Sequence, residues 1–413
     1  MVFFNEIRQQ MNRFVNLIGY QDAVSRINRY NWNPISDVTT KVSGSLGMIS
    51  AEDIFAKTPL PTRERSLVDG YAIRSIDSTG ASTENPVRFK IIGRKEAGSG
   101  KKFNISKGEC VEIYTGASLP DGCDSVIMTE NAVTARGGIT ITEELSPGMN
   151  VSKVGEDINR DFQIIHKGDQ IGSFQITAML SSGTANIRVK RRINVGVFST
   201  GNELFSSSPD NIRNTAETAV KTFFESGFLK ITRLGKCHDS VEEISKKVKH
   251  SMEIMDATII TGGTSLGRYD LVPEALSGIA ETLFGGVRIR PGRTAALYSL
   301  SGKPVFSVSG FPSSAIISLW LFLPHYVKAV TGMNDESRWK RMKLATGLHS
   351  KAGYTTVIPV RISDDSDGMK VSTVSSGGSV RMIDMLNADG LVVVPDNVEG
   401  YSENDVVEVY GVC

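Results

Sequence analysis

The sequence has few of the residues that build metal or disulfide frameworks. Its four cysteines, among 413 residues, form no C-x-x-C pair, which argues against a zinc ribbon and a disulfide scaffold. The five histidines form no H-x-x-x-H or similar spacing, so a histidine-built metal site is not expected. We expect at least three of the thiols to be buried and free, while Cys413 is terminal.

The sequence also has no large excess of positive or negative charge and no long apolar run. The net charge is +1, so no overall basic field exists to hold nucleic acid or a membrane surface. No apolar stretch of signal-peptide length begins the chain, and the most apolar run, residues 316–324, is shorter than a membrane span. We therefore expect a cytoplasmic protein with no nucleic-acid or membrane partner, in which a local site catches any anionic ligand.

The length exceeds what one hydrophobic core supports, so two to four domains are expected. Residues 3–32 have helical spacing in two segments, residues 86–145 have short β patterns with a hairpin at 136–139, and residues 173–183 predict a helix. From Ile193 strands and helices alternate, which predicts a parallel sheet covered on both faces. The predicted strands are 193–199, 230–235, 257–261, 286–290 and 305–309, and the predicted helices are 214–226, 240–254, 270–280 and 313–331. After Met333 the pattern predicts a small β-barrel or sandwich.

The most informative segment is residues 257–270. A β-branched strand runs into Gly262 and Gly263, then into hydroxyls that include Ser265, and ends at the carboxylate of Asp270. Glycine lets a backbone approach a ligand closely, and a helix start offers free N–H groups to an anion. Loops at the carboxyl ends of parallel strands are where open α/β sheets bind ligands. A tight turn with a capping Asp is the alternative.

The ends of two neighbouring strands predict a ligand site at the same edge of the sheet. The first strand ends in Ser199, Thr200 and Gly201, with Glu203 two residues later. An ordinary turn with a surface glutamate explains this loop equally well when it is taken alone. Asp239 follows the second strand at a helix start, where capping is at least as good an explanation as catalysis.

The last two strand ends supply anion-binding groups. Arg290 and Arg293 flank a Pro-Gly turn, and guanidinium groups on a rigid turn suit bidentate recognition of phosphate or another oxyanion. Ser313 or Ser314 can cap the following helix and leave N–H groups for an anion. Solvated arginines and a plain N-cap are the alternatives.

Taken together, these loops imply Mg²⁺-assisted transfer or hydrolysis on a phosphate-bearing substrate, because carboxylates and phosphates commonly hold Mg²⁺. No Walker A lysine motif, kinase signature or Ser-His-Asp set is visible in the sequence. The N-terminal half adds three loops, which contain Asp69, Thr115 and Asp157.

In order along the chain, these motifs resemble the molybdopterin molybdenumtransferase family, which includes the C-terminal domain of gephyrin. The resemblance covers nearly the whole chain, and the ordered set is specific although each member is weak. The matching pieces are Pro-Leu-Pro61, Asp-Gly-Tyr-Ala72, Thr-Gly-Ala-x-x-Pro-x-Gly-x-Asp-x-Val126 with Glu130, Gly-Glu-Asp-Ile158, Ser-Thr-Gly-Asn-Glu-Leu204, Thr-Gly-Gly-Thr-Ser-x-Gly-x-x-Asp270, Arg-Pro-Gly-Arg293 and Gly-Phe-Pro312.

The resemblance implies a multi-domain α/β plus β fold. Residues 1–50 and 146–190 would form an elongated N-terminal helical and β domain, and residues 51–145 a β insertion. Residues 191–335 would form a central doubly wound α/β domain that binds the pterin, and residues 336–413 a small C-terminal β-barrel. Family members form homodimers in which the insertion of one subunit faces the α/β cleft of the other.

The activity that the resemblance implies is Mg²⁺-dependent hydrolysis of adenylyl-molybdopterin, with insertion of molybdate or tungstate into the dithiolene. Transient contacts with the adenylyltransferase and with cofactor-accepting enzymes are implied as well. The catalytic candidates are Asp69, Asp157, Glu203, Asp239 and Asp270, of which Glu203 and Asp270 are the metal candidates. The substrate-binding candidates are Thr115, Ser199, Thr200, Gly201, Gly262, Gly263, Ser265, Arg290, Arg293 and Ser313.

The sequence departs from the family pattern at four places. Only Lys153 is basic where an Arg-rich run usually precedes Gly-Glu-Asp, and arginines replace the lysines that usually flank the Pro-Gly turn. Ser-Ser-Ala315 replaces Gly-Asn-Pro, and Asn-Thr-Ala216 replaces Asp-Ser-Asn, which loses an acid and an amide. A weakened paralogue that binds pterin or acts as a scaffold, or one tuned to tungstate or a modified pterin, is therefore an alternative. An adenylyltransferase acting one step earlier is a third, and the long β insertion fits it poorly.

Overall fold

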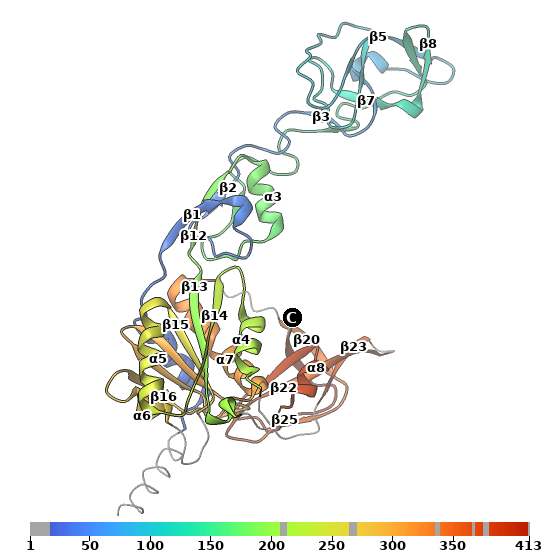
Figure 1. The fold of residues 1–413 in the computed structure, drawn as a ribbon. Helices are drawn as coiled ribbons and strands as arrows, with labels where there is room; N and C mark the ends of the chain where they lie inside the picture. The colour runs from blue at the N-terminus through green and yellow to red at the C-terminus, as the bar shows by residue number, and fades with distance from the viewer. Residues whose placement is uncertain are drawn as a thin grey trace, which may run out of the picture.

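The computed structural model describes residues 17–206, 213–263, 271–334, 339–365, 368–374 and 380–411. Figure 1 shows an elongated molecule with a β sheet at one end, a narrow neck, a small layer of strands with one helix, and a wide end. The wide end contains an α/β body with a β-barrel beside it. The multi-domain α/β plus β class predicted from the sequence is confirmed. The domain boundaries stay predictions.

The far end is a six-stranded sheet with strand order β7-β4-β6-β5-β9-β8. Its strands are β4 (Gly70–Ile73), β5 (Val87–Lys95), β6 (Glu109–Ile113), β7 (Ser125–Met128), β8 (Ala132–Ala135) and β9 (Gly138–Ile141). The predicted hairpin joins β8 to β9 through Arg136 and Gly137, whose φ angles are 41° and 74°. Two positive φ angles are typical of a type I′ turn, whose twist matches that of the paired strands.

The narrow middle of the molecule pairs segments that are far apart in the chain. The pairs are β1 (Asp37–Lys41) with β12 (Asn186–Lys190), β2 (Ile54–Phe55) with β11 (Gln163–Ile165), and β3 (Arg65–Ser66) with β10 (Val151–Ser152). The predicted helix at 173–183 is α3 (Ser173–Ser181). Within α3 only Met179 is buried, in a small cluster that includes Val42 and Ile187.

The α/β body contains a six-stranded sheet with order β14-β13-β15-β19-β18-β16. The first four strands are parallel, and β18 is antiparallel to both of its neighbours. The strands are β13 (Ile193–Thr200), β14 (Leu229–Cys237), β15 (Ala257–Thr261), β16 (Glu281–Gly285), β18 (Ala296–Leu300) and β19 (Lys303–Val308). The prediction that residues 286–290 form a strand of this sheet is wrong, because β16 and β18 fill that edge. Only β17 (Ile289–Arg290) forms there, and it pairs with the barrel.

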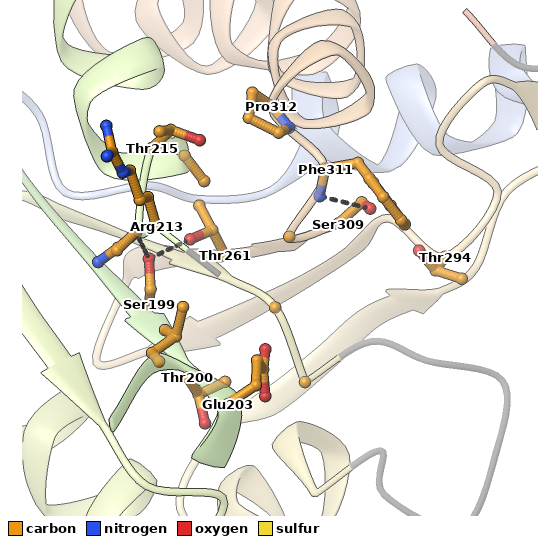
Figure 2. Close-up of a pocket in the computed structure, with 16 residues that line it drawn as sticks. Ser199, Thr200, Glu203, Arg213, Thr215, Thr261, Thr294, Ser309, Phe311 and Pro312 are labelled. Carbon is orange, nitrogen blue, oxygen red and sulfur yellow. Dashed lines mark hydrogen bonds between the residues drawn. The ribbon is translucent and has the colours of Figure 1, made fainter. Parts of the chain in front are cut away.

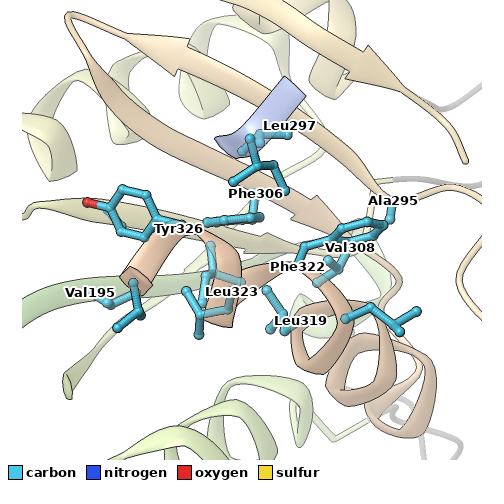
Figure 3. Close-up of a cluster of buried hydrophobic side chains, with 14 of the residues drawn as sticks. Val195, Ala295, Leu297, Phe306, Val308, Leu319, Phe322, Leu323 and Tyr326 are labelled. Atoms are coloured by element: carbon cyan, nitrogen blue, oxygen red, sulfur yellow. The ribbon is translucent and has the colours of Figure 1, made fainter. Parts of the chain in front are cut away.

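Helices cover both faces of the sheet, because alternate strand side chains point to opposite sides. The helices are α4 (Ala216–Phe224), α5 (Val241–Ile254), α6 (Val272–Leu276) and α7 (Pro312–Thr331). Figure 3 shows Val195, Phe306 and Val308 packed against Leu319, Phe322 and Tyr326 of α7. On the other face, Phe198 and Ile260 pack with residues of α5 and α6. Ser240 caps α5 by accepting a hydrogen bond from Glu243 N, as its motif predicts.

One helix packs differently from what the sequence predicts. The helix α2 (Tyr20–Arg29), assigned with residues 1–50 to the elongated part, packs instead against α7 and β16, and its buried Ala23 and Ile27 join the α/β core. The first predicted helical segment lies almost wholly outside the described residues. The run 316–324 alone is shorter than a membrane span, but the whole of α7 is long and apolar enough to cross a membrane. However, 61% of its most apolar 18-residue window is buried inside the protein.

The C-terminal part is a closed small β-barrel, as the resemblance implies. Strands run in the order β17-β22-β23-β20-β26-β24, and pairing of β22 with β24 closes the ring. The strands are β20 (Trp339–Leu344), β22 (Thr355–Asp365), β23 (Gly368–Thr373), β24 (Gly390–Val394) and β26 (Val406–Gly411), with the short pair β21 (Leu348–His349) and β25 (Gly400–Tyr401) and the helix α8 (Met382–Leu386) beside them. The predicted burial of three free thiols is also confirmed, at Cys110, Cys123 and Cys237.

The middle layer docks on the α/β body through two glycines. A Cβ built on Gly227 would lie 2.5 Å from Gly47 Cα and 2.6 Å from Gly47 O, so the two backbones touch. Nearby, Asn334 Nδ2 donates to Asp169 Oδ1 at 2.6 Å and Asn334 N donates to Gly168 O at 2.9 Å. A side chain at position 227 would therefore force the two parts of the molecule apart.

We expect Gly227→Ala to lower the free energy of unfolding by about 1–3 kcal/mol, the usual cost of overpacking a close contact. Gly285→Ala is the control, because a Cβ there meets nothing within 4 Å. Urea unfolding measures both variants. Equal stability of the two would contradict the proposed docking contact.

Candidate functional site

A cavity of about 540 Å³ lies at the carboxyl ends of β13, β15 and β19 (Figure 2). This is the edge at which the sequence predicts ligand binding. The lining residues are Ser199, Thr200, Glu203, Leu204, Arg213, Asn214, Thr215, Ala216, Thr261, Gly262, Gly263, Thr294, Ser309, Gly310, Phe311 and Pro312. Five of the predicted site residues therefore meet here: Ser199, Thr200, Glu203, Gly262 and Gly263.

Two glycines allow the loops after β13 and β15 to touch. Ser199 pairs with Thr261 in the parallel ladder, so both strands end at the same level. A Cβ on Gly262, whose φ is 89°, would lie 2.4 Å from Thr200 O. A Cβ on Gly263 would lie 2.7 Å from the Thr200 methyl group. Any larger residue would separate the loops and open the cavity floor.

Hydroxyl and amide groups form the polar floor of the cavity. The Ser199 hydroxyl donates to Asn214 Oδ1 at 2.8 Å, and Ser199 Oγ lies 2.7 Å from Thr261 Oγ1 (Figure 2). Because the single Ser199 proton is used toward Asn214, Thr261 must be the donor in the second bond. The orientation of both hydroxyls is therefore fixed before any ligand arrives.

A buried carboxylate supports this floor. Glu217, in the first turn of α4, is 0% exposed, and its Oε1 accepts a hydrogen bond from Asn214 Nδ2. Its Oε2 accepts no hydrogen bond from the described residues and lies 3.6 Å from Nε of Arg233, whose side chain is 51% exposed. This contact sets the orientation of the Asn214 amide, so that its oxygen faces Ser199. Glu217 thus places a carboxylate beside Asn214, the position at which the family pattern has an aspartate.

Asp239 stabilises the loop after β13. Its Oδ1 accepts a hydrogen bond from the Thr200 hydroxyl at 2.7 Å, and its Oδ2 accepts one from Asn202 N at 3.2 Å. Ser240, the next residue, is the helix cap, so capping does not explain Asp239. Two predicted site residues, Asp239 and Gly201, do not line the cavity. Gly201 lies against the Glu203 carboxylate.

Within the described residues, Glu203 is the only carboxylate that lines the cavity. Asp270 and Ser265 lie outside the described residues, and no group of three or more potential metal ligands occurs in the part of the chain that the structure describes. A single carboxylate still suits Mg²⁺, which typically binds through one or two carboxylates together with substrate phosphates and water.

The two arginines lie in a neighbouring cavity. Arg290 and Arg293 line a space of about 390 Å³ together with Ser314 and Tyr354, between the α/β body and the barrel. Arg290 is placed there because β17 pairs with β22, and its guanidinium carbon lies 5.2 Å from the centre of the Tyr354 ring. Within one chain the two arginines therefore line a cavity that adjoins the one lined by Glu203. The two cavities lie on either side of the segments 293–294 and 312–314.

Ser313 points toward the barrel. Its hydroxyl donates to Val380 O at 2.9 Å, and it lines neither of these two cavities. The N-cap of α7 is Phe311, and no side chain caps that helix. Ser313 therefore connects α7 to the barrel within this chain.

The other three candidates lie far from the cavity within one chain. Asp69 directly precedes β4 and Thr115 shortly follows β6, in the insertion sheet at the opposite end of the molecule (Figure 1). Asp157 is exposed in the segment between β10 and β11. Thr115 donates to Asp69 Oδ1 through both its backbone N and its hydroxyl, each at 2.8 Å. The backbone hydrogen bond, followed by the hydroxyl bond, lowers the pKa of the Asp69 carboxyl and keeps it ionised.

Several residues at the site are not predicted from the sequence. The motif around Asn214 indicates only a lost acid, and nothing in it indicates the buried Glu217, although an acid in the first turn of a helix beside the cavity is a usable signal. Thr294 directly follows the Arg-Pro-Gly-Arg293 motif, and Phe311 is the middle residue of Gly-Phe-Pro312. Burial, rather than residue type, distinguishes Glu217 from the many surface glutamates.

Known proteins resemble this chain over almost its whole length. Three family models match: the MoeA N-terminal region (domain I and II) at residues 18–183, a probable molybdopterin binding domain at 196–329, and the MoeA C-terminal region (domain IV) at 341–412. The molybdopterin molybdenumtransferases of Staphylococcus epidermidis and Staphylococcus aureus are each 30% identical, over 400 and 403 residues, with 95% of both chains covered. A crystal structure of the molybdopterin biosynthesis MoeA protein from Pyrococcus horikoshii has 28% identity and a TM-score of 0.76, and covers 96% of this chain and 100% of that one.

We expect Glu217→Ala to lower the free energy of unfolding by about 1–3 kcal/mol, because it leaves the Asn214 amide without an acceptor. Glu217→Gln keeps an acceptor oxygen and should lose less. Thr218→Ala, at an exposed position of the same helix, should change stability by no more than about 0.5 kcal/mol. Urea unfolding measures all three, and an equal loss for Ala and Gln would contradict the support by Glu217.

Proposed function

Because the chain belongs to the molybdopterin molybdenumtransferase family, whose members are transferases of molybdenum cofactor biosynthesis, we propose that it catalyses the metal-insertion step. The substrates are adenylyl-molybdopterin and molybdate or tungstate. The adenylyl phosphate bond is hydrolysed with release of AMP, and the oxyanion is inserted into the dithiolene.

One observation carries the proposal: a carboxylate, fixed hydroxyls and two touching glycine loops line the cavity at the carboxyl edge of the sheet. Its volume suits a ligand of nucleotide or pterin size, since small-molecule sites span roughly 300–1,000 Å³. The backbone groups of Gly262 and Gly263 can approach a phosphate because no side chain stands in the way.

The residues fit a magnesium ion held through Glu203 and the substrate phosphate, with Asp270 as the proposed second ligand. When bound, Mg²⁺ neutralises phosphate charge and favours attack by water. The chain itself contributes orientation: Ser199 and Thr261 have fixed hydroxyls, and Asp239 fixes Thr200. These groups need little reorganisation when the substrate binds.

Arg290 and Arg293 are the proposed oxyanion ligands. Their cavity adjoins the first one, so an oxyanion held there would lie next to a substrate in the main cavity. Planar guanidinium forks suit bidentate contact with a tetrahedral oxyanion. Tyr354, beneath Arg290, limits the directions in which that side chain can turn.

A homodimer is the proposed assembly. β13 begins next to β12 of the middle layer and ends at the cavity, and its eight residues span about 26 Å. The cavity therefore faces away from the insertion sheet of its own chain, so Asp69 and Thr115 can reach only the cavity of a second copy. The helix α3 offers a surface for this contact, because its Phe174 is 87% exposed and Leu180 is also exposed.

The weakened-paralogue alternative predicts ligand binding without turnover. Its main support is the loss of an acid at Asn214, and the buried carboxylate of Glu217 beside that residue weakens this support. The retained Glu203 also opposes it.

We expect the purified protein, given Mg²⁺, molybdate and adenylyl-molybdopterin, to release AMP and form cofactor that activates a cofactor-free molybdoenzyme. Tungstate in place of molybdate tests the choice of oxyanion. Glu203→Gln should lower AMP release by at least roughly tenfold, since even an outer-shell partner of a metal costs 10–100-fold. The exposed Glu253→Gln is the matched control.

An active homologue is the positive control. If the native protein binds AMP but releases none from the substrate under conditions in which the homologue does, the binding or scaffold alternative is favoured. Equal rates for Glu203→Gln and the native protein would contradict the assigned role of Glu203.

We expect Phe174→Asp to halve the molar mass measured by light scattering, because a charge replaces an apolar contact at the proposed interface. Met369→Asp, at an exposed apolar position on the barrel, should leave the mass unchanged. A monomeric native protein would refute the homodimer, and a dimeric Phe174→Asp variant would refute the interface.

A further inference from the structure

An exposed phenylalanine stands at the rim of the main cavity. Phe311 lines the cavity, and 77% of it is exposed, although the loop that contains it joins a buried strand to a buried helix (Figure 2). A single exposed apolar side chain needs no explanation on an open surface. At the mouth of a ligand-sized cavity, the same exposure leaves the ring available to whatever the cavity binds.

The backbone of Phe311 is fixed without any ligand. Its N–H donates to Ser309 Oγ at 3.2 Å, and its carbonyl accepts from Ala315 N at 2.9 Å as α7 begins. Pro312 follows, which restricts the residue before it to extended backbone, and Phe311 has φ −75° and ψ 118°. These three local constraints hold the backbone of Phe311 at the rim, so little backbone entropy is lost when a ligand contacts the ring.

The other phenylalanine close to the rim is already engaged. Phe205, which follows the lining residue Leu204, stacks on His238 with ring centroids 3.7 Å apart and planes 17° apart. Lys236 Nζ lies 4.3 Å from the Phe205 ring centre. Among the described residues no comparable ring contact involves Phe311. Of these two rim phenylalanines, Phe311 is therefore the one whose ring face is available to a ligand.

We propose that Phe311 recognises the substrate by stacking on a flat nitrogen heterocycle. The inference rests on the proposed function, whose substrate contains two such groups, the adenine and the pterin. An aromatic side chain gains from offset stacking on a heterocycle beyond the apolar area that it buries. Polar groups on the cavity floor and an aromatic face at its rim would then bind the two ends of one ligand.

The test is isothermal titration of the full-length protein with two separate probes, AMP and anaerobically prepared molybdopterin. Phe311→Ala should weaken binding of one probe by roughly 5- to 100-fold, the range for loss of one base–aromatic stack. Phe311→Trp, which keeps a flat face, should bind within a few-fold of the native protein. Phe311→Leu, which keeps apolar bulk without a flat ring, should bind more weakly than Phe311→Trp.

Ile254→Ala is the control, since Ile254 is exposed and ends α5, at the other edge of the sheet. A loss confined to AMP assigns the stack to adenine, and a loss confined to molybdopterin assigns it to the pterin. Unchanged affinity of Phe311→Ala for both probes, or equal affinities of the Leu and Trp variants, overturns the inference. A native protein that binds neither probe overturns the proposed function itself. If Phe311→Ala instead has half the molar mass of the native protein by light scattering, the ring contacts the second subunit, and only the stacking inference fails.

Discussion

The parallel pairing of β13 with β15 is the constraint on which the cavity depends. Since Ser199 and Thr261 are partners in the ladder, their strands end side by side, and both following loops start at the same level. The loops can remain in contact only because Gly262 presents no Cβ to the Thr200 carbonyl. Hydroxyls from both strands then form a floor that Asn214 and, behind it, Glu217 hold in one orientation.

A second strand pairing, between β17 and β22, decides where Arg290 lies. Two residues that follow β16 of the α/β body, Ile289 and Arg290, join the barrel sheet. The barrel thereby supplies Tyr354 beneath the guanidinium and closes one side of the arginine cavity. Glu203 lines one cavity, and Arg290 and Arg293 line the adjoining one. This arrangement suits a reaction with two anionic substrates, because each anion then has its own binding groups.

The length of the molecule adds a third constraint. The contact between Gly47 and Gly227 fixes the middle layer against the α/β body, and the insertion sheet then lies at the end opposite the cavity. Asp69 and Thr115 are connected by two hydrogen bonds of 2.8 Å, which hold two exposed groups in one arrangement far from the cavity of their own chain. The proposed homodimer gives this pair a place at the site.

The sequence by itself determined the alternation of strands and helices, the β composition of the two outer parts, and the loops at which Ser199, Glu203 and Gly262 meet. These depend on local periodicity and on strand ends, which neighbouring residues encode. Only the tertiary structure decided the position of Arg290 beside the barrel, the packing of α2 in the α/β core and the burial of Glu217. Each of these depends on contacts between segments distant in the chain, and residue type alone does not distinguish a buried carboxylate or a barrel-paired strand from a surface one.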